Sequence, residues 1–343
     1  MNKRALITGI TGQDGSYLAE LLLLKGYSLV GITSGKSSKH NLSSIEERIE
    51  WIAGDITDEA FVRETVRNVM PDEIYNLASI ATVAEPWKDV PELARVVALT
   101  PLYFLEAIRA LDPRIRFFQA SSAEMFGAPL ESPQNELTPL VPRNPYGIGK
   151  VFAHSMVGGY RANHKLFAAS GILFTHESPR RPDQFVTRKI TSSLAKIKLG
   201  LLDHFELGNL DAKRDWGFAG DYTDAMWRML QTETPDDYVI ATGEAHTVRE
   251  FVQESAKVLG MKIAFEGSGV DEVGKDEEGK VILTVNPAFF RPIEEVVRCG
   301  DASKLRAATA WRPAVSFGAL VAMMAQADLE IAGKKVNPHS RVA

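Results

Sequence analysis

Cysteine is almost absent from this chain of 343 residues, in which Cys299 is the only one. A single cysteine excludes an intrachain disulfide and a metal site built from cysteines. The histidines show no metal-ligand spacing, so we expect no metal. Long apolar runs are also missing: none approaches the roughly 18 residues of a membrane span, and the N-terminus lacks the order of a signal peptide. We therefore expect a cytoplasmic protein without a membrane partner.

An excess of positive charge is lacking as well. The chain has 39 lysines and arginines against 44 aspartates and glutamates, a formal net charge of −5. No domain-wide basic surface is available, so we expect no nucleic-acid partner. Local clusters of cations suit a small polyanion such as a nucleoside diphosphate, although a solvated surface explains them equally well on composition. These cations are Arg180, Arg181, Arg188, Lys189, Lys213, Arg214 and Arg291.

The first thirty residues predict a dinucleotide-binding turn. Residues 4–8 have the apolar pattern of a buried parallel strand, and residues 16–25 that of a helix. Gly9, Gly12 and Gly15 lie between them. This spacing allows a tight turn, a close approach of the backbone to a pyrophosphate at the helix N-terminus, and close packing of helix on strand.

A carboxylate is missing where such folds choose between cofactors. An acidic residue after the second strand, here residues 28–32, would bind the ribose 2′-hydroxyl of NAD. Residues 33–39 instead contain hydroxyl groups, Lys36 and Lys39. The segment favours NADP, and a solvated basic loop is the alternative interpretation.

Strands and helices alternate along the first half of the chain. Expected strands at 49–53, 73–77, 116–120 and 172–174 are separated by helical patterns such as 59–69 and 91–110. This alternation predicts an α/β fold with a doubly wound parallel sheet of Rossmann type.

The pattern becomes irregular after residue 175, which indicates a smaller C-terminal substrate-binding lobe. We expect residues 267–279 to form a surface loop, residues 317–331 a packed helix, and the chain from Lys334 a frayed end. The predicted division is a cofactor domain of 1–175 plus about 215–245, a lobe of 176–214 and 246–330, and a tail of 331–343.

Tyr146 and Lys150 predict a proton-handling site. Residues four apart share a helix face, so the ammonium group can lie beneath the phenol and lower its pKa from about 10 toward the range of a general base. Ser122 and Glu124 follow an expected strand, at the sheet edge where open α/β folds bind ligands. Such a tyrosine and lysine by themselves are more often an ordinary helix face, and their conjunction with the other features favours catalysis.

Several longer runs resemble a known family. They are GITGQDGSYL at 9–18, HESPRR at 176–181, FVTRKI at 185–190, GNLDAKRDWG at 208–217 and FRP at 290–292. With these runs the chain is similar, over nearly its whole length, to the GDP-mannose 4,6-dehydratase family of extended short-chain dehydrogenases/reductases. The resemblance implies a hydro-lyase that converts GDP-mannose to GDP-4-keto-6-deoxymannose through tightly bound NADP.

The resemblance also implies roles for individual residues. The family's catalytic positions fall on Ser122, Glu124, Tyr146 and Lys150. Tyr146 would take the proton of the sugar 4-hydroxyl, and Glu124 would remove the C5 proton and assist loss of the 6-hydroxyl, while the hydride removed from C4 returns to C6. Cofactor binding is assigned to Gly9, Thr11, Gly12, Gln13, Asp14, Gly15, Lys36, Ser37, Asp55, Ile56, Leu77, Ala78, Tyr146 and Lys150. Substrate binding is assigned to Thr175, Glu177, Val186, Lys189, Arg214, Arg291 and Glu294.

The chain departs from the family pattern at several positions. Hydrogen-bonding groups are replaced at Ile80, Ala81, Thr82, Ala123, Phe126, Thr175 and Phe218. These changes suggest a roomier, less polar sugar pocket and a GDP-manno-heptose as the alternative substrate. The family's paired arginines after the second strand are missing, which leaves NADP favoured over NAD and weakens the transfer of the family's tetramer. A homo-oligomer, dimer or tetramer, is expected.

Other functions remain open at this point. An epimerase or reductase of the same superfamily would use Ser122, Tyr146 and Lys150 without needing Glu124. A non-catalytic NADP-binding regulator would need none of the four.

Overall fold

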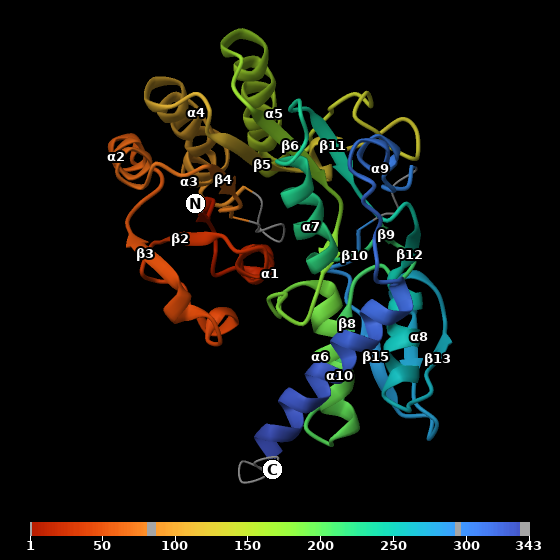
Figure 1. Ribbon diagram of the computed structural model, residues 1–343. Helices are drawn as coiled ribbons and strands as arrows, with labels where there is room; N and C mark the ends of the chain where they lie inside the picture. Colours follow the sequence, from red (N-terminus) through yellow and green to blue (C-terminus); the bar gives the residue numbers. More distant parts are fainter. Residues whose placement is uncertain (1, 81–86, 292–295, 337–343) are drawn as a thin grey trace.

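A parallel sheet forms the centre of the molecule. The computed structural model describes residues 2–80, 87–291 and 296–336 (Figure 1). Seven strands pair in the order β11-β6-β5-β4-β1-β2-β3, and every pairing is parallel. The strands are β1 (Arg4–Thr8), β2 (Ser28–Thr33), β3 (Ile49–Ala53), β4 (Glu73–Asn76), β5 (Arg116–Ser122), β6 (Ala168–Leu173) and β11 (Asp237–Ile240).

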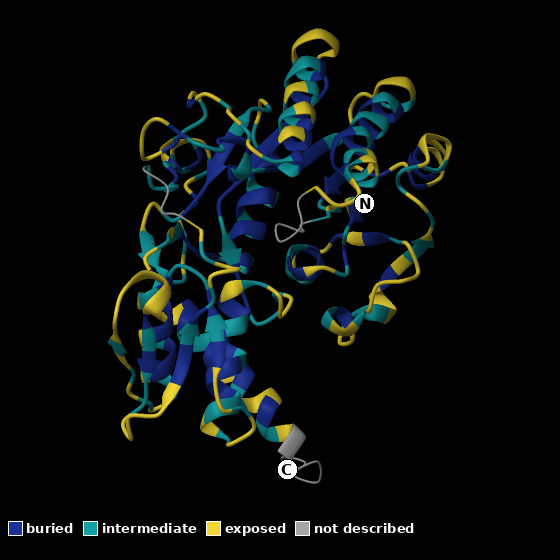
Figure 2. Cartoon of the chain, turned by 180° about the vertical axis from the view of Figure 1, so that it is seen from behind, coloured by how far each residue is buried: buried dark blue, intermediate teal, exposed yellow. Residues whose placement is uncertain are grey.

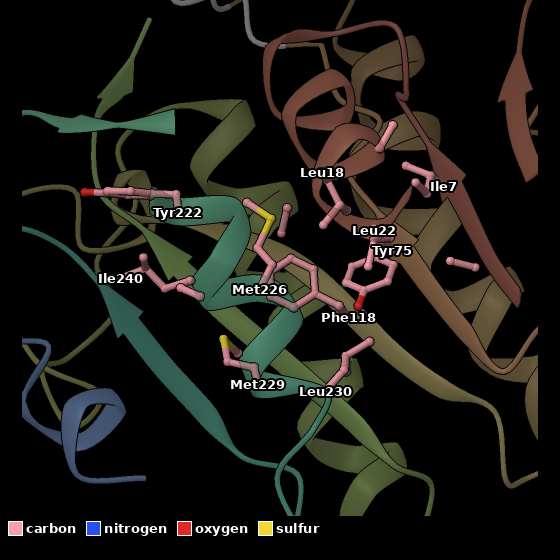
Figure 3. Close-up of a cluster of buried hydrophobic side chains, with 14 of the residues drawn as sticks. Ile7, Leu18, Leu22, Tyr75, Phe118, Tyr222, Met226, Met229, Leu230 and Ile240 are labelled. Carbon is pink, nitrogen blue, oxygen red and sulfur yellow. The ribbon is translucent and has the colours of Figure 1, made fainter. Parts of the chain in front are cut away.

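Helices cover both faces of this sheet, as the alternating pattern predicts. On one face α1 (Gln13–Leu24) packs against α7 (Ala219–Met229). Figure 3 shows Leu18 and Leu22 of α1 meeting Met226 of α7 over the sheet residue Tyr75. The other face carries α2 (Glu59–Val69), α4 (Thr100–Leu111) and α5 (Pro145–His164), whose apolar residues form a second cluster. Covering both faces buries the strands and confirms the predicted doubly wound fold.

A smaller lobe lies beside the sheet domain, at the bottom of Figure 1. It contains α6 (Val186–Lys198), α8 (Val248–Val258), α10 (Phe317–Val336) and a sheet in the order β13-β14-β15-β8. The strands are β8 (Phe205–Leu207), β13 (Ala264–Glu266), β14 (Val273–Lys275) and β15 (Val281–Val285). Figure 2 shows that this lobe has its own buried interior. Within it, the Arg188 guanidinium on α6 contacts the Asp328 carboxylate on α10 at 2.8 Å.

Short strand pairs join the lobe to the central sheet. The pair β7 (His176–Glu177) and β10 (Gly217–Phe218) is parallel, and β9 (Lys213–Asp215) pairs antiparallel with β12 (Ala245–Thr247). The helix α9 (Ser303–Thr309) lies within the span predicted for the lobe, but Leu305 and the following Trp311 pack in the core between α1, α7 and the sheet.

Three local expectations differ from the structure. The expected helix at 91–110 is divided into α3 (Val90–Ala94), a π-turn (Arg95–Leu99) and α4, which has a proline in its first turn and therefore lacks one N–H donor there. The expected loop at 267–279 is interrupted by β14 (Val273–Lys275), which pairs with both β13 and β15, and is wrong for those residues. The last helix continues to Val336, so Lys334 is helical.

Candidate active site

The glycine turn has the geometry that a pyrophosphate needs. A Cβ atom at Gly15 would lie 2.3 Å from the carbonyl oxygen of Gly9, so only glycine permits this contact between helix and turn. No side chain caps α1 at Gly12, so the helix N-terminus is open to an anion. The Thr8 hydroxyl accepts hydrogen bonds from the backbone N–H groups of Leu77, at 3.1 Å, and Ala78, at 3.0 Å, and thus joins the ends of β1 and β4. These features fit a dinucleotide.

The side chains of Gln13 and Asp14 reach toward the chain that enters the lobe. Ser178 donates to Gln13 Oε1 at 2.8 Å, and His176 Nε2 lies 2.9 Å from Asp14 Oδ2. Burial raises the pKa of Asp14, but the adjacent His176 outweighs it and the net pKa is lowered. Burial lowers the pKa of His176, and Asp14 reverses this to a net rise. These two predicted cofactor residues therefore also connect the turn to β7.

The outer cofactor residues lie past the neighbouring strands β2 and β3. Lys36 and Ser37 are exposed, and Lys36 is near enough to contribute to the lowered pKa of Asp55, although hydrogen bonds from Thr57 are the larger cause. Lys39 is paired with Glu46 at 2.7 Å. The remaining predicted contacts, Thr11 and Ile56, are half-buried, and the carbonyl of Thr11 accepts a hydrogen bond from Asn41 at 3.3 Å.

Tyr146 is placed by the start of α5. The side chain of Asn144 caps this helix by accepting a hydrogen bond from the Gly147 N–H at 2.8 Å. Pro145 occupies the first turn, where its missing N–H costs nothing. A Cβ at Gly147 would lie 2.6 Å from the carbonyl oxygen of Glu124, so the glycine allows the helix to touch the segment that carries the carboxylate.

The Lys150 ammonium lies over the Tyr146 ring, as the spacing predicts, but its hydrogen bond goes to the adjacent strand. Its Nζ donates to the carbonyl oxygen of Ala120 at 2.6 Å and lies 5.5 Å from the centroid of the Tyr146 ring. Burial lowers the pKa of Lys150 to about 8. Burial raises the pKa of Tyr146, and the hydrogen-bonding hydroxyls of Ser79 and Ser122 only partly oppose this rise. The prediction of a lowered phenol pKa is therefore wrong.

Glu124 lies in a short 3-10 helix (Ala123–Met125) directly after β5. Ser122 Oγ accepts the Glu124 N–H at 3.2 Å and so caps this turn. The carboxylate oxygens have different partners: Oε2 accepts from Asn144 Nδ2 at 3.1 Å, and Oε1 forms an ion pair with Arg298. Burial raises the pKa of Glu124, but Arg298, with smaller contributions from Asn144 and Arg214, produces a net lowering.

The predicted substrate residues gather where the lobe meets the sheet domain. Thr175 accepts a backbone hydrogen bond from Gly217 at 3.0 Å, and Val186 begins α6. Glu177 is buried, and it accepts a hydrogen bond from Thr187 at 2.8 Å and pairs with Arg181 at 3.2 Å. Burial raises its pKa above the ordinary value. Glu177 is thus bonded within the protein.

The predicted phosphate-binding cations divide into two groups. The Lys189 ammonium lies 4.7 Å from the Phe289 ring, two residues before Arg291. The Arg291 carbonyl accepts a hydrogen bond from Asn209 at 3.0 Å. Lys189 and Arg291 therefore both lie near the loop that follows β15. Arg180 is bound to Glu20 at 2.6 Å, and Arg188 is the buried partner of Asp328. Arg188 is therefore a structural cation, and Arg180 has a partner within the protein. Glu294 lies outside the described residues.

The family departures that the structure describes are largely packing positions. Phe126 is fully buried, and its ring centroid lies 6.0 Å from that of Phe174. Ala123 is buried in the same cluster, and the Phe218 ring packs 5.2 Å from that of Tyr17. These contacts provide no support for a roomier sugar pocket. Ala81 and Thr82 lie outside the described residues.

Sequence reasoning missed three contacts of the site. Asn144 was visible only as part of an Asn-Pro helix start, and its second contact with Glu124 is a tertiary feature. Asn76 of β4 pairs with Gln119 of β5, and Ser79 and Ser122 each lie three residues further along their chain segments. The strand register therefore places Ser79 opposite Ser122, which sequence alone does not reveal. Arg298 is 174 positions from its partner, and no local pattern indicates it.

The described parts of the chain lack two kinds of feature. No group of three or more histidine, cysteine, aspartate or glutamate side chains within residues 2–80, 87–291 and 296–336 is arranged to hold a metal ion. Among those same residues no helix has the length and apolar character needed to cross a membrane.

Comparison with known proteins gives a consistent result. The family model described as GDP-mannose 4,6 dehydratase matches residues 6–324. The chain is 47% identical to the GDP-mannose 4,6 dehydratase of Drosophila melanogaster, covering 97% of this chain and 88% of the relative. It is 46% identical to the human protein of that name, covering 98% of this chain and 93% of the relative.

Among solved structures, the fold resembles that of RMD from Pseudomonas aeruginosa complexed with NADPH. The TM-score is 0.77, the sequence identity 20%, and the match covers 96% of this chain and 100% of the other. This likeness confirms the Rossmann-type fold. The family match and the high identity to full-length relatives show more than the fold: the chain belongs to the GDP-mannose 4,6-dehydratase family of hydro-lyases.

Proposed function

We propose that this protein removes water from GDP-mannose to give GDP-4-keto-6-deoxymannose, with NADP as its cofactor. The observation that carries the proposal is the meeting of Ser122, Glu124 and Tyr146 at the carboxyl end of β5, with Lys150 one helical turn behind Tyr146. Two groups able to exchange protons at one site suit a reaction that needs two bases, whereas simple alcohol oxidation needs one.

NADP, when bound, supplies a reversible hydride acceptor at the sugar. The open N-terminus of α1 would bind its pyrophosphate, and Asp55, Ile56, Leu77 and Ala78 follow the strands beside that turn. Lys36 and Ser37 are exposed beyond β2, at the position that meets a 2′-phosphate in such folds.

The GDP part of the substrate would be bound by the lobe. Lys189 and Arg291 lie near the loop that follows β15, and Arg214 is near enough to Glu124 to influence its pKa. Arginine side chains match phosphate oxygens with paired donors. Together with Val186 at the start of α6, these cations would hold the diphosphate so that the hexose extends toward β5.

The side chains at β5 would then act in sequence. Tyr146, as its phenolate with the Lys150 ammonium over its ring, accepts the proton of the 4-hydroxyl as the alcohol is oxidised, and the hydroxyl of Ser122 donates to the resulting 4-keto oxygen. The ketone makes the C5 proton acidic. Glu124 removes this proton, and the 6-hydroxyl leaves as water. Addition of the hydride taken from C4 to C6, and of a proton to C5, would then give the 4-keto-6-deoxy sugar.

One experiment tests this function directly. Purified protein is incubated with GDP-mannose deuterated at C4, and the product is analysed by NMR. We expect a 4-keto-6-deoxy sugar with the deuterium at C6 and no net change in NADPH. Retention of the 6-hydroxyl, or loss of deuterium to solvent, would overturn the proposal. Parallel turnover of a GDP-manno-heptose measures the alternative substrate, and we expect GDP-mannose to be preferred.

A homo-oligomer is part of the same proposal. Ile148 and Phe152, four residues apart on α5, are 52% and 40% exposed, and they form an apolar strip on the helix that carries Tyr146 and Lys150. We expect two copies to pack through this helix. Light scattering of the wild type and of a variant with Ile148→Glu and Phe152→Glu would show a dimer or tetramer changing to a monomer.

A further inference from the structure

A guanidinium group lies against the carboxylate that serves as the second base in the proposed function. Arg298 Nη1 donates to Glu124 Oε1, while Asn144 Nδ2 donates to Oε2 at 3.1 Å. The Arg298 side chain is 11% exposed and that of Glu124 26%. Both carboxylate oxygens therefore have a partner in a largely enclosed place, where an ion pair is screened less than at the surface.

The backbone around Arg298 is held firmly. Cys299 donates its N–H to Gln134 Oε1 at 3.1 Å and accepts from the Gln134 N–H at 2.8 Å. Gly300 donates to Asp215 Oδ2 at 3.1 Å, and Gln134 is completely buried. These bonds fix the segment that carries Arg298 relative to the lobe and the sheet. The guanidinium is thus placed by tertiary structure, in contrast to a mobile surface cation.

We propose that Arg298 is a positioning residue for the loss of water, acting through Glu124. The inference rests on the proposed function. In this step the C5–H bond breaks and its proton passes to Glu124. The electron pair forms the C5=C6 double bond as the C6–O6 bond breaks, and O6 takes the proton from Glu124 and leaves as water.

The cation assists both halves of this proton transfer. Before the step it keeps Glu124 ionised and aimed, and because a carboxylate has about four lone-pair sites, its pairing leaves room for the C5 proton. After the step, the adjacent positive charge favours loss of the proton from the neutral acid. The proton is therefore passed readily to O6. Glu124 also faces the Arg214 charge, the Tyr146 phenol and the neutral amide of Asn144.

The test removes the charge and keeps the shape as far as possible. In Arg298→Gln we expect water loss from GDP-mannose to slow roughly 10- to 100-fold, less than the roughly 10²- to 10⁴-fold contributed by an acid or base itself, because Arg298 acts only through Glu124. The acid limb of its pH profile should move to higher pH, because the pKa of Glu124 rises when the cation is removed. Arg298→Lys retains a charge and should restore much of the rate and the original acid limb.

A second substrate separates this role from a general structural one. GDP-6-deoxymannose has no leaving hydroxyl, so only its oxidation at C4 is possible. We expect that oxidation to fall by less than about threefold in Arg298→Gln, because Tyr146 performs it. Lys304→Gln is the matched control. Lys304 lies on α9 and forms an ion pair with Asp236 at 2.7 Å, and its loss should leave the rates of both reactions near those of the wild type.

Several results would overturn the proposal. One is an Arg298→Gln variant whose acid limb is unchanged and whose rate of water loss is within about threefold of wild type. Another is a variant in which the rates of C4 oxidation and water loss fall equally. If Arg298→Gln does not fold, as judged by thermal denaturation, Arg298→Met replaces it, and failure of both would assign Arg298 to the fold. A wild-type protein that leaves GDP-mannose unchanged would instead disprove the proposed function.

Discussion

The two side chains proposed to exchange protons with the substrate, Tyr146 and Glu124, have pKa values that their surroundings shift in opposite directions. The pKa of Tyr146 is raised by burial, whereas that of Glu124 is lowered by its ion pair with Arg298. The hydroxyl groups that hydrogen-bond to Tyr146 belong to Ser79, just after β4, and to Ser122, the last residue of β5. Glu124 needs an arginine that enters between the lobe and the sheet. In the proposed mechanism the sheet domain thus supplies the groups for alcohol oxidation, and Arg298 adds a group that acts on the loss of water.

The largest expected effect comes from removing the phenol. Tyr146→Phe should reduce both oxidation at C4 and water loss by roughly 10²- to 10⁴-fold, because the second step needs the ketone made in the first. NMR with GDP-mannose and GDP-6-deoxymannose measures both steps. Tyr160→Phe, on the same helix, is the control and should keep both activities. A Tyr146→Phe variant that still oxidises C4 normally would break the comparison.

Removal of the carboxylate should affect one step only. Glu124→Gln keeps the shape but is no longer a base, so water loss should fall by about 10²- to 10⁴-fold. Oxidation of GDP-6-deoxymannose should change by less than about threefold. The exposed Glu131→Gln is the control. Unchanged water loss would remove Glu124 from the proposed role and would favour a reductase or epimerase.

The decrease of kcat/KM at alkaline pH should report the deprotonation of Lys150. Burial lowers the pKa of Lys150 to about 8, so its positive charge is present below that pH and is lost as the pH rises through it. We expect kcat/KM to decline above pH 8, by up to about tenfold per pH unit. In Lys150→Met we expect kcat/KM to be much lower at every pH and to show no decline above pH 8. A decline that persists in the variant would assign it to another group.

The smallest effect is expected for Asn144, which caps the helix that carries Tyr146 and also donates a hydrogen bond to Glu124. Asn144→Ala loses the cap of α5, worth about 1 kcal/mol of stability, and also the hydrogen bond to Glu124. We expect a small decrease in Tm and a decrease in water loss of about tenfold. Asn163→Ala, near the other end of α5, is the control. Equal effects of the two variants would show that the contact with Glu124 does not matter.

The sequence predicted those parts of the structure that repeat with a period or form a local motif. The doubly wound sheet followed from alternating apolar strands and helices, and the turn at Gly15 from its glycine spacing. The hydrogen-bond partner of the Lys150 ammonium was missed, because residues four apart share a face but the side chain's final partner is set by the adjacent strand. Arg298 was missed because its contact with Glu124 exists only after the lobe has folded. The strand β14 was missed because an acidic, glycine-rich segment has little strand propensity and depends on its neighbours.

The bonds from Gln13 and Asp14 to Ser178 and His176 have a consequence for how ligands enter. They fasten the dinucleotide turn to the first residues of the lobe. A hinge motion between the two halves would have to break the Gln13–Ser178 hydrogen bond and the partly buried Asp14–His176 contact at once. We therefore expect the dinucleotide turn and the lobe to keep a fixed relative position when the nucleotide sugar binds. The cofactor's diphosphate and the sugar's diphosphate would then be held at a constant separation.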